Sequence, residues 1–143
     1  YTKTDLIETE LNLIGTVMEC LSNKYYRLHV VKDSEFDVIT SDSPFILSHP
    51  SGGKRFYFGL NTPKIEICVP ITRNTILIAR NEFFKEGVFP ADDQFIGLTN
   101  TKLILSASRF FYSSKQEIAL IDDDINVYKH VISSNKASQR IKR

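Results

Sequence analysis

The polar turn Thr40-Ser41-Asp42-Ser43-Pro44 contains the residue types best suited to chemistry in this chain. It follows an extended run, and the end of a strand places polar side chains at the rim of a sheet, where ligands commonly meet a protein. Asp42 is therefore a candidate metal ligand or general base, with Thr40 and Ser41 as candidate binding residues beside it. The alternative is structural: Ser41 and Asp42 hold the turn by side-chain to amide hydrogen bonds. Turn chemistry by itself favours this structural alternative over catalysis.

Arg109 is the second residue of interest, because it lies between a predicted helix and the aromatic run Phe110-Phe111-Tyr112. A guanidinium there is expected to pair with Asp42 across the sheet, either as a structural clamp or as the anion-recognising half of a site. Asn100, in the predicted helix, is a further candidate binding residue. An enzyme would gather Asp42, Asn100 and Arg109 around one pocket, with Asp42 and Arg109 as its catalytic residues.

Complete catalytic or metal-binding sets are not found in the sequence. A metal-dependent nuclease needs two convergent carboxylates and often a lysine, and the nearest match, Asp42 with Glu66-Ile67-Cys68, has cysteine where lysine is wanted. Asp122-Asp123-Asp124 is expected to form a solvated acidic surface, because consecutive residues of a helix point about 100° apart. No G-x-S-x-G elbow is present, so Ser41 and His49 would form a nucleophile and base only by an accident of folding. Gly52-Gly53-Lys54 lacks the spacing of a phosphate loop. No metal site and no cofactor are predicted; Mg²⁺ or Mn²⁺ enters only if the chain is an enzyme.

These residues depend on helices and strands that the hydrophobic pattern predicts. Apolar residues from Leu6 to Leu21 recur at three- and four-residue steps, which predicts an amphipathic helix. The period then changes to two, which predicts a strand over residues 25–31 and a hairpin partner over 36–40. Further extended segments are predicted at 55–58, 65–69, 75–79 and 109–112, with a loop over 48–54, a polar connection over 81–90 and a second helix over 91–108. Residues 115–133 are ambiguous, because their apolar spacing fits a helix that the three aspartates could equally interrupt, and residues 134–143 are expected to fray.

Length and composition predict one α+β domain over residues 1–143, with a mainly antiparallel sheet packed against two or three helices. The 143 residues are 42% hydrophobic, enough for a core, and carry a formal charge of only +1. A near-neutral chain lacks the one-sided field of most nucleic-acid and membrane-surface proteins. Basic and aromatic residues do alternate at 55–58 and 109–112, so nucleic acid stays open as a partner, although such residues in strands are more often core.

The cellular location expected from these features is the cytoplasm. No apolar run reaches the roughly 18 residues of a membrane helix, and no signal segment is recognisable. Cys20 and Cys68 have apolar neighbours and no metal-ligand spacing, which favours buried free thiols. The chain begins at Tyr1 without an initiator methionine. A fragment that lacks an upstream segment is therefore an open alternative.

Three segments, in order, resemble the domain of unknown function 4238 family. Residues 36–44 resemble its F-x-x-I-T-S-D-N-P signature, with Ser43 in place of asparagine. Residues 67–72 with 76–78 look like its F-P-L-S strand pair, with Thr72 in place of serine, and Asn100 followed by Ala107, Arg109 and Tyr112-Ser113 is similar to its helix ending in A-x-R-x-x-Y-S. The family's early segments, H-Y-x-P-Q and L-R-x-F, have no counterpart here. The resemblance implies no established reaction, and it implies an association with bacterial antiphage defence.

The function expected from the sequence is a binding or interaction module, without a complete catalytic set and linked to conflict between bacteria and phages. Its partner would be a protein or a small ligand, it has no membrane partner, and its oligomeric state is not predicted. The competing hypothesis is a metal-dependent hydrolase or nuclease acting on phosphoesters through Asp42, Asn100 and Arg109.

Overall fold

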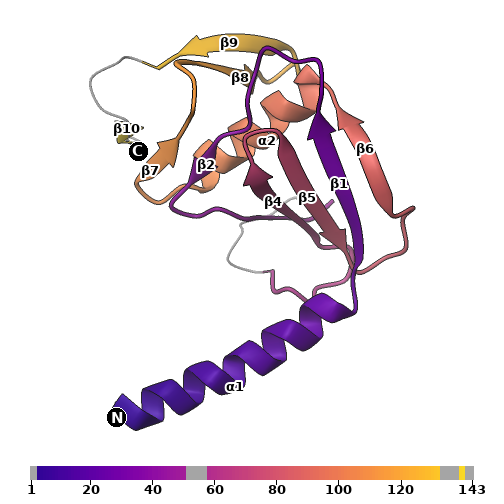
Figure 1. Cartoon of the computed structure of the whole chain (residues 1–143), viewed down its shortest axis with the longest axis vertical. Helices are drawn as coiled ribbons and strands as arrows, with labels where there is room; N and C mark the ends of the chain where they lie inside the picture. The colour runs from indigo at the N-terminus through magenta and orange to yellow at the C-terminus, as the bar shows by residue number, and fades with distance from the viewer. Residues whose placement is uncertain (1–2, 51–57, 133–138, 141–143) are drawn as a thin grey trace.

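The computed structural model describes residues 3–50, 58–132 and 139–140, which form two helices and three sheets (Figure 1). The helices are α1 (Lys3–Ser22) and α2 (Asp93–Ser106). The strands are β1 (Tyr25–Val31), β2 (Thr40–Ser41), β3 (Ile46–Ser48), β4 (Glu66–Thr72), β5 (Thr75–Arg80), β6 (Gly87–Ala91), β7 (Phe110–Tyr112), β8 (Glu117–Ile121), β9 (Val127–Val131) and β10 (Gln139–Arg140).

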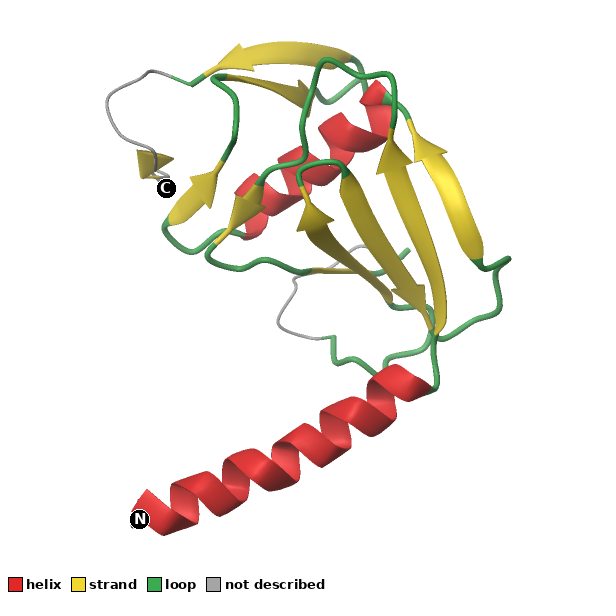
Figure 2. Ribbon diagram, viewed as in Figure 1, coloured by secondary structure: helices red, strands yellow, loops and turns green. Residues whose placement is uncertain are grey.

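The largest sheet has the strand order β3-β4-β5-β1-β6, and only its β1–β6 pair is parallel (Figure 2). A second sheet has the order β10-β7-β2, and β8 pairs with β9 in an antiparallel hairpin. The predicted α+β class with a mainly antiparallel sheet is confirmed, with two helices in the described part of the chain. The predicted strands at 65–69 and 75–79 are confirmed as β4 and β5.

Helix α2 lies in the core, as its sequence predicted. Asp92 caps its first turn by accepting a hydrogen bond from the amide of Phe95 (2.7 Å). Gly97 lets the helix approach β8 closely, because a Cβ there would lie 3.0 Å from the Ile121 side chain and 3.3 Å from the Leu120 carbonyl carbon. The core formed with α2 joins apolar side chains of both larger sheets and of β8, including Val38, Ile46, Ile76, Ile78, Leu103, Phe111 and Ile118.

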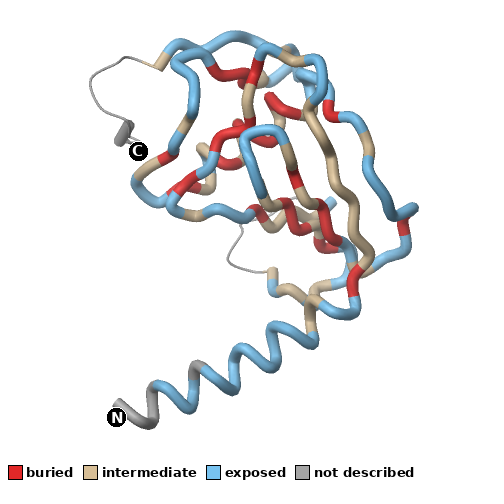
Figure 3. Tube along the Cα trace, viewed as in Figure 1, coloured by how far each residue is buried: buried red, intermediate tan, exposed pale blue. Residues whose placement is uncertain are grey.

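Helix α1 extends away from the rest of the molecule, and its described side chains are mostly exposed (Figure 3). The predicted amphipathic helix is confirmed, but its apolar stripe does not face the core: Ile7, Leu11, Ile14 and Met18 are 49–62% exposed. Its C-terminal end is tied to β1, because the Tyr26 hydroxyl donates to the Leu21 carbonyl (2.6 Å). Neither described helix has the combination of length and apolar character that crossing a bilayer requires.

The predicted strand over residues 36–40 is wrong, as is its pairing with residues 25–31. Strand β1 pairs instead with β5 and β6, and only Thr40–Ser41 forms a strand, which pairs with β7. Phe36, Val38 and Ile39 are all buried, so protein surrounds this segment instead of covering one face. Its amides find partners outside a ladder, as the Val38 amide does at the Arg73 carbonyl (2.7 Å).

Two other segments differ from the expected pattern or decide an open alternative. The connection predicted over 81–90 ends in strand β6, where Pro90 is tolerated because β6 is the edge of the sheet. The helical pattern in residues 115–133 does not form a helix, since β8 and β9 pair as a hairpin with the three aspartates in the connection between them. Asp122 closes its turn by accepting hydrogen bonds from the amides of Asp124 and Asn126. Most of the predicted loop over 48–54, the segment 55–57 and most of the tail lie outside the described residues.

Candidate functional site

The carboxylate of Asp42 is bound by three consecutive backbone amides just after α2. Oδ1 accepts from Ser108 (2.9 Å), and Oδ2 accepts from Arg109 (2.8 Å) and Phe110 (3.2 Å). Successive amides of this kind form a nest that favours an anion. Desolvation would by itself raise the pKa of Asp42, but hydrogen bonds from the amides of Ser108, Arg109 and Phe110 outweigh it and lower that pKa. Asp42 therefore acts first as an internal anion that fixes the start of β7.

Arg109 meets Asp42 through its backbone and not through its guanidinium. The expectation that the Asp42 turn and the start of the Phe110 strand come together is confirmed, since Asp42 also donates its amide to the Phe110 carbonyl (3.0 Å). The expected guanidinium–carboxylate pair is not among the ion pairs of the described residues. The nest amides already satisfy Asp42, and the Arg109 residue is exposed.

Asn100 is a buried structural residue with every polar atom bonded. Its Oδ1 accepts from the Ile39 amide (3.0 Å), and its Nδ2 donates to the carbonyls of Asp37 and Ala119 (3.1 Å each). The residue is 0% exposed. The side-chain amide thus replaces the ladder partner that residues 37–39 lack, and it ties them to α2 and β8. The enzyme hypothesis requires Asn100 to share a pocket with Asp42. The buried Asn100 side chain does not meet this requirement.

These two supports frame a groove between three segments that are distant in sequence. The groove is lined by residues 38–40, 70–73 and 112–114, and its cavity volume is about 270 Å³. Asn100 holds the first segment, the β4–β5 hairpin presents the second, and Asp42 fixes the strand that leads into the third. Each of these segments overlaps one of the three sequence patches that resemble the family. We define the groove lined by 38–40, 70–73 and 112–114 as the motif groove.

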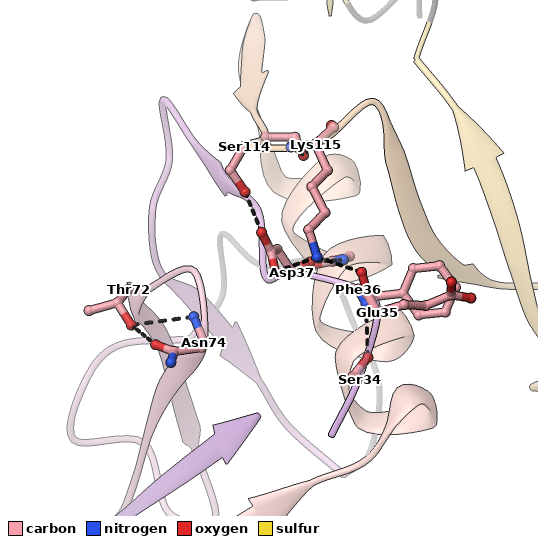
Figure 4. A network of polar contacts seen from close by, with 10 residues as sticks. Ser34, Glu35, Phe36, Asp37, Thr72, Asn74, Ser114 and Lys115 are labelled. Atoms are coloured by element: carbon pink, nitrogen blue, oxygen red, sulfur yellow. Dashed lines mark hydrogen bonds and ion pairs between the residues drawn. The ribbon is translucent and has the colours of Figure 1, made fainter. Parts of the chain in front are cut away.

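A polar network supports both sides of the motif groove (Figure 4). On one side the Ser114 hydroxyl donates to Asp37 Oδ2 (2.5 Å), and Lys115 Nζ lies 3.0 Å from Asp37 Oδ1. Desolvation acts to raise the pKa of Asp37, but hydrogen bonds from Ser114 and Lys115 and the positive charge of Arg73 hold it below its ordinary value. On the other side the Thr72 hydroxyl donates to Asn74 Oδ1 (2.6 Å), which shapes the hairpin tip.

The remaining reactive residue types are engaged elsewhere. Burial, followed by the charge of Glu66, raises the pKa of the Cys68 thiol to about 12, so Cys68 is a protonated core residue, as the buried-thiol prediction has it. Cys20 is free and half-buried. Glu66 pairs with Arg80, and no group of three or more His, Cys, Asp or Glu residues that could hold a metal ion occurs among the residues described.

Contacts within the protein also involve Ser41, His49 and part of the aromatic run Phe110–Tyr112. The Ser41 hydroxyl donates to the Ser43 carbonyl (2.8 Å), and the His49 ring stacks on Phe58 and lies 3.1 Å from the Pro63 carbonyl oxygen. Phe111 is buried in the core, whereas Tyr112 reaches the motif groove.

Of the five predicted site residues, only Thr40 lines the motif groove. Ser41, Asp42 and Asn100 support its walls from behind, and Arg109 enters through its amide. The sequence did not single out Arg73, Ser114 or the Asp37–Lys115 pair. Tyr112-Ser113 belonged to the third patch, which was the signal available for that wall. Nothing in the pattern around Arg73 distinguished it from an ordinary hairpin residue.

Comparison with known proteins identifies a family but no characterised relative. The family described as "Protein of unknown function (DUF4238)" matches residues 2–117. This range includes all three segments of the motif groove. No curated protein and no solved structure matches the chain.

Proposed function

Because the chain belongs to the DUF4238 family of unknown function, its role has to be argued from its own residues, and we propose that it is a non-catalytic binding module whose recognition surface is the motif groove. The observation that carries this proposal is the convergence of residues 38–40, 70–73 and 112–114 on one groove. Segments so far apart in sequence meet there because dedicated polar contacts, those of Asn100 and Asp42, hold two of them in place.

The state of the polar side chains supports binding over catalysis. A general base or metal ligand needs lone pairs directed at a substrate. The Asp42 oxygens instead accept three amide hydrogen bonds, and the Asn100 amide makes three buried hydrogen bonds. Thr40, Arg73 and Tyr112 line the groove and are exposed, which suits recognition of a ligand.

A fragment screen followed by ¹⁵N–¹H NMR tests the binding proposal. Fragments are expected to shift the amides of residues 38–40, 71–73 and 112–114. Thr40→Arg, which places a long side chain in the groove, is expected to remove these shifts. Gln116→Arg adds the same charge at an exposed position outside the groove lining and is expected to keep them. Fragments that bind only elsewhere, or equally well to Thr40→Arg, would disprove the proposal.

Phosphoesterase assays separate this module from the competing hydrolase. With Mg²⁺ or Mn²⁺, cleavage of bis-p-nitrophenyl phosphate and of single-stranded DNA is expected to equal that of Asp42→Asn and of a protein-free blank. Metal-dependent turnover that Asp42→Asn abolishes, in a variant whose circular dichroism spectrum is unchanged, would establish the hydrolase instead.

A role in bacterial defence and a cytoplasmic location complete the proposal. Bacteria that produce the chain are expected to plate a panel of phages less efficiently, and Thr40→Arg is expected to remove that protection while Gln116→Arg keeps it. Unchanged plating would separate the chain from defence. Fractionation of producing cells checks the location, and recovery with the membrane or culture medium would contradict it.

A further inference from the structure

The lining of the motif groove carries a net positive charge. Arg73 is the charged residue of its lining, which contains no aspartate or glutamate among the described residues. Asp37, whose pKa the positive charge of Arg73 helps to lower, is 13% exposed and is bound by Ser114 and Lys115. Lys115 forms the ion pair with Asp37, whereas Arg73 acts on Asp37 only through its charge. The charge of the Arg73 guanidinium remains at the groove surface.

Three polar groups of the lining have no hydrogen-bond partner among the described residues and are suited to bind a ligand. Within the part of the chain that the structure describes, the Arg73 guanidinium and the hydroxyls of Thr40 and Tyr112 make no hydrogen bond or ion pair with the protein. The hydroxyls of Ser113 and Ser114 are already used, since they donate to the Lys115 carbonyl and to Asp37. One guanidinium with two hydroxyls is a donor set suited to an oxyanion, which a planar guanidinium binds with two parallel hydrogen bonds.

Apart from Thr72, whose hydroxyl donates to Asn74, the rest of the lining is apolar. Val38 and Ile39 are only 5% and 1% exposed, so the apolar surface open to a ligand comes from Pro70 and the half-exposed Ile71. A volume of about 270 Å³ is slightly below the range of roughly 300–1,000 Å³ typical of drug-sized ligand pockets. The groove therefore has room for a single ring or a short chain with one head group.

We infer, on the basis of the proposed function, that the motif groove binds a small organic oxyanion: a carboxylate or phosphate head group on Arg73, Thr40 and Tyr112, and a ring-sized apolar body over Pro70 and Ile71. Recognition of the head group requires the fork geometry of the guanidinium in addition to its charge. A lysine at position 73 would keep the charge and lose the paired hydrogen bonds.

NMR titration of the whole chain with four probes tests the inference. Benzoate and phenyl phosphate carry the apolar body and the head group, benzyl alcohol lacks the charge, and inorganic phosphate lacks the body. We expect saturable shifts at residues 38–40, 71–73 and 112–114 for benzoate, phenyl phosphate or both, and binding of benzyl alcohol and inorganic phosphate weaker by about tenfold. Whichever of the two organic anions binds more tightly identifies the head group.

Variants of Arg73 and Arg109 provide the matched comparison. Arg73→Gln is expected to weaken the binding of the organic anion by about tenfold or more, and Arg73→Lys is expected to weaken it by less. Arg109→Gln removes an exposed arginine outside the groove lining and is expected to change nothing. All three should keep the wild-type melting temperature, because the Arg73 contact to Val38 is made by its backbone carbonyl.

The outcomes separate this inference from the proposed function. If benzyl alcohol binds in the groove as tightly as benzoate, or if Arg73→Gln keeps full affinity, the oxyanion inference is wrong and the groove remains a binding site. If inorganic phosphate binds as tightly as phenyl phosphate, the apolar body is not recognised and the inference fails in that form. If no probe and no screened fragment shifts the groove amides, both fail together.

Discussion

The Asn100 side chain makes hydrogen bonds to the backbone of residues 37–39 that a neighbouring strand would otherwise make. The segment 37–39 runs through the core without a ladder partner at Ile39, and the Asn100 amide supplies one acceptor and two donors to the surrounding backbone. Asp42 plays a similar part for the amides of residues 108–110. Both residues have the chemistry of a catalytic site, and both use it on the protein's own backbone.

Asn100→Ala is expected to destabilise the fold strongly. It leaves the Ile39 amide and the carbonyls of Asp37 and Ala119 without this partner, and an unsatisfied buried group costs about 1–3 kcal/mol. A loss of roughly 3–5 kcal/mol in the free energy of unfolding follows for the set. Urea denaturation measures it, with Leu105→Ala, 77% exposed on the same helix, as the control. A loss below 1 kcal/mol would show that water replaces the amide.

Asp42→Asn is expected to lower the melting temperature at pH 7 and to reduce the loss of stability between pH 7 and pH 3. Because the folded pKa of Asp42 is depressed, its stabilisation is present above the unfolded pKa, about 3.9, and is lost as the pH falls through the folded pKa. Thermal unfolding at pH 7 and pH 3 checks this, with Asp123→Asn on the exposed β8–β9 turn for comparison. An equal pH response in the wild type and Asp42→Asn would contradict the nest.

His29 is expected to make the fold less stable below neutral pH. Its ring stacks on Phe95 at 4.3 Å, and its buried Nδ1 has no hydrogen-bond partner among the described residues. Desolvation lowers its pKa, although the Pro90 backbone partly opposes this. The unfolded chain thus binds the proton more readily, so stability is full above an unfolded pKa of about 6.5 and falls as the pH drops toward the folded pKa.

Denaturation of the wild type and His29→Phe at pH 7.5 and pH 5.5 checks the His29 prediction. Phenylalanine keeps the stacking and cannot be protonated, so the variant is expected to lose less stability at pH 5.5. His130→Phe, at an exposed position on β9, serves as the control and should behave like the wild type. If His29→Phe loses as much stability as the wild type, another group carries the pH dependence.

At the scale of elements, both helices have an apolar face, but α2 buries this face in the core and α1 exposes it to solvent. Ile96 and Leu103 of α2 are 0% exposed, whereas the stripe of α1 faces outward. Most helices in proteins are stabilised by packing of their apolar face, and an exposed apolar stripe is typical of a surface that meets another surface. The position of α1 is therefore consistent with an interaction module.

The double substitution Leu11→Gln and Ile14→Gln is expected to change the free energy of unfolding by no more than about 0.5 kcal/mol, because both side chains are already exposed. Ile76→Ala, at a residue that is 0% exposed in the core, is expected to cost roughly 2–5 kcal/mol. Urea denaturation followed by circular dichroism measures both. A double variant as unstable as Ile76→Ala would place the α1 stripe against the core.

At the scale of the whole molecule, one apolar cluster connects elements from residue 38 to residue 120. It includes side chains of the five-stranded sheet, of the β2–β7 sheet, of α2 and of β8, so none of these elements has a core of its own. Elements that share one core usually unfold together. We therefore expect the elements that contribute to this cluster to unfold together; a single domain over residues 1–143 stays a prediction.

Calorimetry tests the single-domain prediction. The calorimetric enthalpy is expected to equal the van't Hoff enthalpy in one transition, and tyrosine fluorescence should report the same midpoint. A second transition that leaves the signals of α2 and β8 intact would show that the five-stranded sheet is a separate unit. Hydrogen exchange adds an independent check, with α1 expected to exchange faster than α2 because its described side chains are mostly exposed.

The sequence by itself determined the elements whose pattern is local. The spacing of apolar residues placed both helices, the alternation at β1 and β4 placed those strands, and turn chemistry identified the bend at Asp42. The order of the three patches identified the family. These features depend on near neighbours in the chain, where helix and strand periods apply directly.

Only the tertiary structure decided which distant groups meet. Residues 36–39 have a strand-like composition, yet long-range bonds from Asn100 and Arg73 override it. Asp42 and Asn100 bond to distant backbone groups of the protein, and the same fold brings Arg73 beside Thr40 and Tyr112 in one groove. No local period encodes such meetings, because they depend on how sheets and helix pack once the chain has folded.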